Sequence, residues 1–409
     1  GMLDTKKHPN FSMHTWEFIS IVAALMAMNA LAIDIMLPAM GVIAEHYKIV
    51  GNGQQWLIYS YILGFGVPQL FFGPITDKYG RRNLLKICMV AYVVFAFLCM
   101  LTSSFYLLCI ARLFQGVFAS GIRVIAISVV RDLTAGRAMA RIMSLVMTVF
   151  MIVPVVAPVI GQGVMIVAGW KWTFGVLGLA GLVVFLWTHY RLPETLRNPS
   201  HTNIGFKSSI NVFFEVLKDR VTTGYMISSG FIYAALFAFI ASAEQIFNDV
   251  FNSGNLFSLW FALIAGTLAL ANFINFRIVD IIGMRRISHI TLILFIFLSF
   301  VNLMVSYFLS ETLIVFLPLF ALTFGCFGML GANFSAIAME NQGDRAGTAS
   351  ALYGFFTTAV SSVFGYFVSS QFNGSVIPIL IGFIFLGLFS LITVIITENG
   401  VLFRATITK

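Results

Sequence analysis

Long apolar runs recur along almost the whole chain, separated by short segments rich in charged and turn-forming residues. A helix needs about 20 such residues to cross a bilayer, so each run is a candidate transmembrane span. The first six runs cover Trp16–Met40, Gln54–Pro74, Asn83–Thr102, Phe105–Val130, Ala138–Ala168 and Trp172–Tyr190. The second six cover Thr222–Asn248, Leu256–Val279, Arg286–Leu309, Thr312–Met339, Ala346–Ser369 and Ser375–Ile396. The pattern predicts an all-α membrane protein with twelve transmembrane helices.

One longer polar connection, Arg191–Val221, separates the two sets of runs. Apolar residues follow a helical stripe near its end, with charged residues opposite: Phe206, Ile210, Phe213, Phe214 and Leu217. Such a pattern is typical of an amphipathic helix that lies at a membrane surface. We interpret it as a bridge, with a binding or regulatory role as the alternative. The expected domains are therefore 1–190, the linker 191–221 and 222–409.

Composition and charge support this interpretation. Apolar residues make up 59% of the chain and charged residues 10%, whereas about a quarter is usual for charged residues in soluble domains. Of 24 Lys and Arg residues, 20 fall on one side if the spans alternate in direction, and that side holds both termini. The positive-inside rule then places both termini in the cytoplasm. Topology thus explains the net charge of +8 without a nucleic-acid partner.

The run Phe105–Val130 carries two arginines, Arg112 and Arg123. Arginine at mid-membrane costs about 2.5–3.5 kcal/mol on insertion scales. The two are eleven residues apart, which returns them to nearly the same helical face, and Gln115 lies beside that face. One side of this helix is therefore expected to line a polar environment.

Short sequence elements repeat between the two halves. Asp77, Gly80 and Arg82 recur as Asp280, Gly283 and Arg285, each 203 residues later. This repeat predicts two pseudo-symmetric six-helix bundles around a central cavity, with the substrate path near the membrane midplane.

Four motifs resemble those of the major facilitator superfamily in the same order and topology. They are LAIDIMLPAM in the first run, GPITDKYGRR after the second, ARLFQG in the fourth and AGTASAL in the eleventh. More narrowly, the chain resembles twelve-span drug/proton antiporters of the bicyclomycin- and chloramphenicol-resistance (Bcr/CflA) type. The resemblance implies a monomeric transporter of the bacterial inner membrane that uses a proton gradient and no cofactor.

The GPITDKYGRR segment is interpreted as a conformational latch, as in the superfamily. Gly73 and Gly80 permit a tight turn, and Asp77 can accept hydrogen bonds from arginines such as Arg81 and Arg82. Asp280 and Gly283 would form its counterpart in the second half. The alternative, a basic loop that only sets topology, explains the arginines but not the glycines and the aspartate.

The fifth run resembles the antiporter signature of the superfamily. Pro154 and Pro158 each remove a backbone donor and are expected to bend the helix, and Gly161 and Gly163 permit close packing. The sequence departs from that signature at Ala157 and Gln162.

Asp34 and Arg112 are the expected proton-coupling residues. Both lie about 10 Å from the outer end of their spans, at about 1.5 Å per residue, so a direct or water-bridged pair is expected. Desolvation and a nearby cation act oppositely on a buried carboxylate, which allows it to bind and release a proton. In the alternatives, Asp34 caps a helix and Arg112 stabilises local structure.

The remaining candidates concern the substrate. Arg123 binds either a structural partner such as Asp132 or a substrate carboxylate or phosphate. Further candidates for substrate binding are Gln115, Asp34, Tyr233, Phe237, Asn272 and Glu244. Glu244 is expected to face outside water unless it binds substrate. For Asn272, an interhelical hydrogen bond competes with pocket lining.

The leading function is proton-coupled export of small amphipathic compounds. The alternative is transport of an anionic metabolite, such as a carboxylate siderophore, bound by Arg112 and Arg123. A membrane enzyme would need a convergent catalytic or metal cluster, but the six histidines are scattered and the four cysteines lack metal-site spacing. A receptor or scaffold would leave the latch-like repeat without a purpose.

Overall fold

The computed structural model describes residues 13–134, 136–196 and 206–404, and within them every regular element is helical. Eleven helices in this part of the chain are long and apolar enough to cross a membrane. A bent pair, Gly53–Gly66 and Gln69–Tyr79, brings the number to twelve if it counts as one span. The predicted all-α membrane fold is confirmed.

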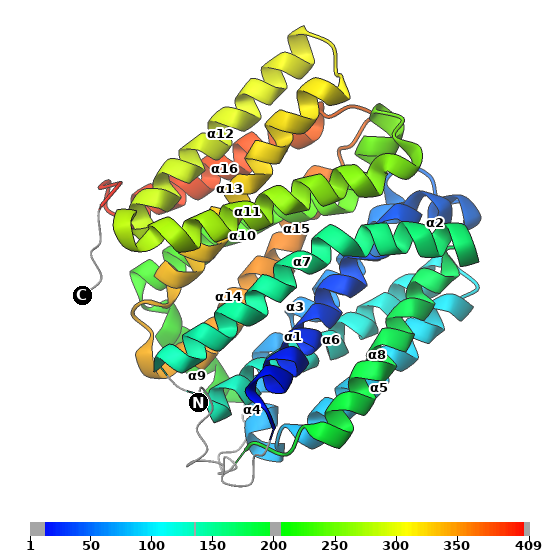
Figure 1. Cartoon of the computed structure of the whole chain (residues 1–409). Coiled ribbons are helices and arrows are strands. Elements are labelled where there is room, and N and C mark those ends of the chain that lie inside the picture. The colour runs from blue at the N-terminus through cyan, green and yellow to red at the C-terminus, as the bar shows by residue number, and fades with distance from the viewer. Residues whose placement is uncertain (1–12, 135, 197–205, 405–409) are drawn as a thin grey trace. The chain divides into compact units, whose positions relative to one another are not determined.

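Internal contacts divide the chain into two compact units. The first comprises Gly1–Ile49 and Trp56–Ser208, and the second comprises Val50–Gln55 and Ser209–Lys409. The helices of the first unit are α1 (Thr15–Asp34), α2 (Met40–His46), α3 (Trp56–Gly66), α4 (Gln69–Tyr79), α5 (Arg82–Leu101), α6 (Phe105–Leu133), α7 (Gly136–Ala168) and α8 (Lys171–Arg191), coloured blue to green in Figure 1.

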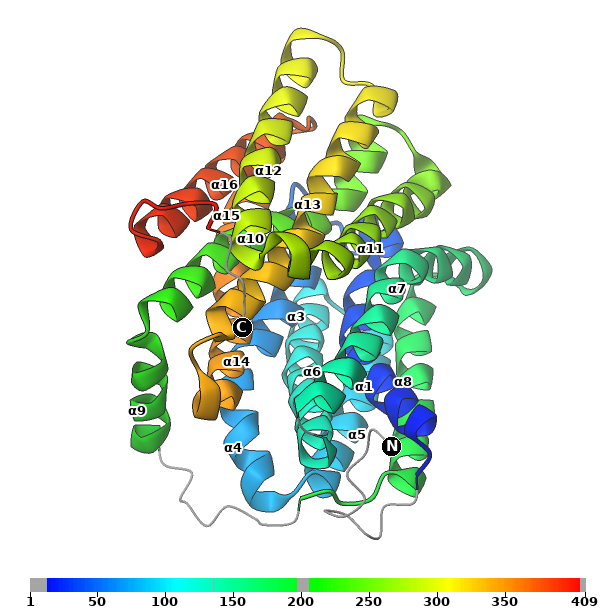
Figure 2. The same ribbon diagram turned by 60° about the vertical axis from the view of Figure 1, so that its left-hand side comes forward.

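The second unit contains most of α9 (Phe206–Leu217), which begins three residues before the boundary between the units, and all later helices. The later helices are α10 (Arg220–Gln245), α11 (Phe257–Ile282), α12 (Met284–Phe308), α13 (Leu313–Met339), α14 (Ala346–Phe355), α15 (Ser361–Ser369) and α16 (Ile377–Thr397). A π-helical turn, Phe356–Val360, joins α14 to α15 within the eleventh span. Figure 2 shows the whole chain turned by 60° about the vertical axis.

Two of the predicted spans differ from the structure. The first ends as a long helix at Asp34, and a 3-10 turn, Leu37–Ala39, leads into α2. The second bends by 44° between α3 and α4, next to Pro68, and its helix continues through Pro74 to Tyr79. Proline lacks a backbone donor and disfavours helical geometry in the preceding residue, which accounts for the break at Pro68.

Glycines bring the helices of the first unit into backbone contact. A Cβ atom on Gly116 of α6 would lie 2.2 Å from the Tyr61 carbonyl oxygen of α3, and one on Gly64 would lie 2.1 Å from that of Leu113. A Cβ on Gly161 of α7 would lie 1.9 Å from the Ile35 carbonyl oxygen, just after α1. Only glycine permits these approaches, so α3 is held on α6 and α7 on the end of α1.

The predicted amphipathic helix of the linker is present as α9. Val216 is buried, whereas Phe214 is exposed. The Phe206 side chain, the linker residues 197–205 and the two chain ends, whose cytoplasmic location is a prediction, lie outside the described residues.

Candidate functional site

Arg112 is completely buried in the first unit and links three of its helices. From α6, its Nη1 donates to the Ala32 carbonyl oxygen of α1 at 2.9 Å, and its Nε donates to the Leu57 carbonyl oxygen of α3 at 3.2 Å. The carbonyl groups in the last turn of a helix lack intrahelical donors and form the negative end of its dipole. The guanidinium of Arg112 therefore supplies a charged donor to the end of α1.

Neighbouring side chains complete the surroundings of this guanidinium. Gln115, also fully buried, accepts a hydrogen bond from Arg112 Nη1 at 3.2 Å. The Tyr61 ring lies 4.6 Å from the guanidinium carbon, a cation–π distance, and the Tyr61 hydroxyl donates to Asn29 Oδ1. Gly116, one turn beyond Arg112, permits the close approach of α3 that brings the Leu57 carbonyl within reach.

Asp34 is the last residue of α1 and is only 5% exposed. Within the described residues its carboxylate forms no ion pair or hydrogen bond with another side chain or with the backbone. The expected direct pair between Asp34 and Arg112 is therefore wrong for this structure. The reason is that Arg112 donates to main-chain carbonyl oxygens, one of which, that of Ala32, lies two residues before Asp34.

Arg123 is half-buried further along α6, and its Nη1 donates to Gln69 Oε1 at 3.1 Å. Gln69 is the first residue of α4, directly after the bend in the second span. The suggested partner Asp132 instead binds Arg81 through both carboxylate oxygens. Arg123 thus contacts the bent span through an amide.

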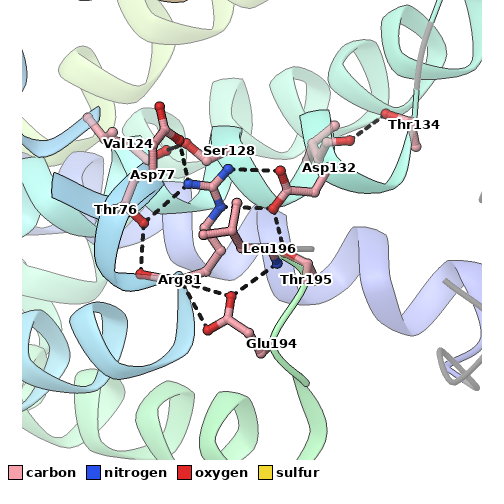
Figure 3. A network of polar contacts seen from close by, with 12 residues as sticks. Thr76, Asp77, Arg81, Val124, Ser128, Asp132, Thr134, Glu194, Thr195 and Leu196 are labelled. Carbon is pink, nitrogen blue, oxygen red and sulfur yellow. Dashed lines mark hydrogen bonds and ion pairs between the residues drawn. The ribbon is translucent and has the colours of Figure 1, made fainter. Parts of the chain in front are cut away.

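Arg81 lies at the centre of a network at the end of the first unit, shown in Figure 3. Its Nε and Nη2 donate to the two oxygens of Asp132, each at 2.8 Å, and its Nη1 donates to Asp77 Oδ1 at 2.7 Å. Burial lowers the pKa of Arg81, but these carboxylates outweigh burial and the net shift is upward. The guanidinium stays charged and joins α4 to the end of α6.

Glu194, after α8, extends this network through the backbone. Its carboxylate accepts from the Arg81 and Arg82 amides at 2.9 and 3.0 Å. Gly80 has φ +93°, and a Cβ atom there would lie 2.7 Å from Glu194 Oε2. The predicted glycine requirement in this turn is thus explained by both backbone conformation and space. At Gly73, by contrast, a Cβ atom would meet nothing within 4 Å.

The second unit contains a similar network around Arg285, in the first turn of α12. Its guanidinium binds Glu340 at the end of α13 and, through Nε at 3.0 Å, Glu398 at the end of α16. Glu398 also accepts a hydrogen bond from the Tyr225 hydroxyl at 2.9 Å. In both units an arginine after the glycine turn therefore binds acids from the ends of other spans.

The arginine contacts of the two units do not follow the sequence repeat residue by residue. The spacing of 203 residues pairs Arg285 with Arg82, yet Arg81 holds the corresponding position in the first unit, and Arg82 is exposed with Nη2 donating to the His189 carbonyl oxygen. Asp280, the repeat of Asp77, is exposed and joins none of the ion pairs among the described residues. The acids Glu340 and Glu398 take its place because they lie beside Arg285 in space.

The substrate candidates of the second unit lie along α10 and its neighbours. Glu244 is buried and accepts hydrogen bonds from Gln54 Nε2 at 2.8 Å and Asn248 Nδ2 at 2.9 Å, so the expectation that it faces water is wrong. The rings of Tyr233 and Phe237 lie 6.3 Å apart.

Asn272 of α11 is partly exposed. A Cβ atom on Gly328 of α13 would lie 3.0 Å from the Asn272 amide nitrogen. Interhelical hydrogen bonds between α11 and α13 come instead from Asn275 and Asn333, which bond each other in both directions at 3.3 and 2.7 Å.

α7 continues as one helix through Pro154 and Pro158. Gly161 has the close packing expected of it, against the backbone directly after Asp34. The same expectation for Gly163 is wrong, because a Cβ atom there would meet nothing within 4 Å.

Sequence reasoning missed several residues that complete these sites: Gln69, Glu194, Thr195, Glu340 and Glu398. Thr195, for example, donates to Asp132 Oδ2 at 2.7 Å. A signal was available, because an acid follows or ends the fourth, sixth, tenth and twelfth spans at corresponding places of the two halves.

Comparison with known proteins gives consistent results over most of the chain. The sequence model described as Major Facilitator Superfamily matches residues 22–366. An uncharacterized MFS-type transporter, YdgK, of Bacillus subtilis is 28% identical, with 84% of this chain and 86% of that protein covered. A bicyclomycin resistance protein homolog of Haemophilus influenzae is 26% identical, with 91% and 93% covered.

Solved structures share the fold at low sequence identity. A partially occluded, inward-open structure of the xylose transporter XylE from E. coli superimposes with a TM-score of 0.72 at 11% identity, covering 94% of this chain and 97% of that one. The human organic anion transporter MFSD10 gives a TM-score of 0.62 at 17% identity, with 92% and 99% covered.

Proposed function

Since this chain belongs to the major facilitator superfamily, we propose that it is a proton-coupled antiporter that exports small amphipathic compounds by alternating access. Its relatives include proteins named for resistance to bicyclomycin and, in Pseudomonas aeruginosa, to chloramphenicol. These names support the substrate class, because both refer to small organic antibiotics.

The observation that carries the proton-coupling part of the proposal is the environment of Asp34. An ionised carboxylate buried without a partner pays a large desolvation penalty. Binding of a proton removes this penalty, and so does opening of the site to water. A conformational change that alternates the exposure of Asp34 therefore also alternates its affinity for protons, as proton coupling requires.

Arg112 supports this cycle in a different way from the one first expected. Its hydrogen bonds to Ala32 and Leu57 hold the end of α1 against α3 and α6. The cation thus contacts the main chain two residues before Asp34 and forms no ion pair with the Asp34 carboxylate among the described residues. Arg112 thus positions the helix end that carries the proposed proton site.

The two arginine networks support the conformational part of the proposal. Each joins a glycine turn to the ends of other spans of its own unit through charge-assisted hydrogen bonds. We assign them the role of latches that stabilise one access state, with both termini in the cytoplasm and the protein in the bacterial inner membrane as a monomer. The cycle uses the proton gradient and no cofactor.

Reconstitution in liposomes with an imposed pH gradient tests the proposal, with chloramphenicol and bicyclomycin as probes. The wild type should accumulate a probe against its gradient and release protons. Asp34→Asn should abolish gradient-driven accumulation while substrate exchange continues at zero pH gradient. Glu45→Gln, an exposed acid in α2 of the same unit, is the matched control and should behave as the wild type.

The antiporter proposal is refuted if the wild type moves probes only down their own gradient, or if Asp34→Asn retains full accumulation. Equal losses in the Asp34 and Glu45 variants would point to nonspecific damage rather than a proton site.

Transport of an anionic metabolite is the second candidate, and Arg123 favours it. This arginine is half-buried on nearly the same face of α6 as Arg112, and its Nη1 donates to the amide oxygen of Gln69. A guanidinium matches the geometry of a carboxylate or phosphate, which supports binding of an anionic substrate on this face of α6. Loss of citrate transport, with retention of chloramphenicol transport, in Arg123→Gln would favour this candidate.

A further inference from the structure

A hollow opens between α5 and α8 at the end of the first unit that carries the Arg81 network. Seven residues from these helices and the chain just after α8 line it: Arg82, Leu85, Lys86, Phe185, Thr188, His189 and Leu192. None of the seven is acidic. The positive-inside rule places this end at the cytoplasmic membrane surface.

The basic groups of the hollow have hydrogen-bond donors to spare. Lys86 is exposed and forms no ion pair or hydrogen bond among the described residues. Arg82 donates from Nη2 to the His189 carbonyl oxygen at 2.7 Å, and its Nε and Nη1 take no part in that bond. The His189 ring stacks on Phe185, with 5.7 Å between ring centroids.

Below the hollow the two helices close against each other. A Cβ atom on Gly181 of α8 would lie 2.9 Å from the Val93 side chain of α5, and one on Gly178 would lie 2.7 Å from the Phe97 ring. The hollow is therefore a notch at the end of a sealed seam and not the mouth of a channel.

Large apolar side chains are exposed on both helices. Val90 and Val94 of α5 follow Lys86 at successive intervals of four residues, so all three lie on one side of the helix. Leu182 and Leu186 are exposed on α8. A basic notch above two apolar helix faces is complementary to an anionic phospholipid, whose phosphate lies at the surface and whose acyl chains lie in the membrane.

We propose that this notch binds the headgroup phosphate of an anionic phospholipid, whose acyl chains lie along α5 and α8. Lys86 and Arg82 contact the phosphate, and His189 lines the site. Basic pockets between transmembrane helices on the cytoplasmic side are suited to such headgroups.

Two described acids near the site, Glu17 and Glu194, are held by other partners: Glu17 pairs with Arg191. The Glu194 carboxylate is occupied by the Arg81, Arg82 and Leu196 amides, at 2.9 to 3.1 Å. The Glu194 carboxylate therefore binds backbone amides at the start of α5, whereas Lys86 lies one helical turn further along that helix.

Native mass spectrometry of the full chain, released from micelles supplied with phosphatidylglycerol or phosphatidylcholine, tests the proposal. The wild type should retain phosphatidylglycerol in preference to phosphatidylcholine. Lys86→Gln should reduce this retention about fivefold, the effect of one basic residue near an anionic lipid surface. Lys86→Arg should retain it, because the charge is kept.

Lys171→Gln is the matched control, since Lys171 is an exposed lysine at the opposite end of α8. Equal loss of lipid in the Lys86 and Lys171 variants would overturn the proposal in favour of nonspecific charge. Displacement of the lipid by millimolar inorganic phosphate would also overturn it, because a free anion would then be the ligand. The readout is binding and not transport, so its failure leaves the proposed antiport unaffected.

Discussion

Gly161 offers a stringent test of the packing around Asp34, because α7 carries its own control two residues away. In Gly161→Ala the new methyl group would lie 1.9 Å from the Ile35 carbonyl oxygen. In Gly163→Ala the same methyl group meets nothing within 4 Å. The two variants share a helix, a substitution and a change in helix propensity, and they differ in this one contact.

The expected magnitudes follow from the geometry. Carbon and oxygen atoms in contact lie about 3.3 Å apart, so Gly161→Ala must separate α7 from the backbone after α1 by roughly 1.4 Å. Overpacking of this kind costs about 1–3 kcal/mol, and the obstacle is a main-chain atom that cannot rotate away. The gain in helix propensity, up to about 1 kcal/mol, offsets part of this cost in Gly161→Ala and is the whole effect in Gly163→Ala.

Thermal unfolding in detergent, together with proton-driven transport in liposomes, measures both consequences. Gly161→Ala should lower the melting temperature and impair transport, because the displaced backbone is one residue from Asp34. Gly163→Ala should match or exceed the wild-type melting temperature with transport intact. Equal melting temperatures and equal transport in the two variants would refute the packing argument.

The other predictions concern the buried arginines, each measured by thermal or chemical unfolding. Arg81→Gln should destabilise the first unit by about 3 kcal/mol, because Asp132 loses its bidentate partner. Arg82→Gln, at an exposed position, should cost less than about 1 kcal/mol. Equal effects of the two substitutions would contradict the assignment of Arg81 as the network centre. Arg285→Gln should cost about 3–5 kcal/mol, because Glu398 stays buried after losing its cation, and Glu398→Gln in the same chain should recover part of this loss. Arg112→Lys should cost about 2–3 kcal/mol, since a single ammonium cannot reproduce the fork that reaches α1 and α3; wild-type stability would show that those carbonyl contacts contribute little.

Much of the fold was predictable because the membrane imposes strong rules on sequence. Backbone groups in hydrocarbon must be satisfied internally, so apolar runs of sufficient length become helices whatever their partners. The spans and the helix α9 follow from these local patterns. The glycine turn at Gly80 was also predictable, because its constraint lies in the backbone of that residue and its neighbours.

Partners of charged residues were less predictable, because they come from distant parts of the chain. The repeat pairs Arg82 with Arg285, yet the direction of each side chain from the start of α5 makes Arg81 the one that meets Asp132. Equal depth in the membrane placed Asp34 and Arg112 together, but depth says nothing of direction. The carbonyl groups at the end of α1 carry no sequence signature.

Sequence by itself thus determined the helical spans, their division into two halves and the family, since these depend on hydrophobic length, local backbone constraints and contiguous motifs. Tertiary structure alone decided which arginine is the centre of each network, that Glu244 is buried against Gln54, and that Asp34 has no ionic partner among the residues the structure describes. The physical reason is that burial and hydrogen-bond geometry are set by where helices cross. Those crossings depend on the fit of Gly64, Gly116 and Gly161 against backbone atoms from other helices.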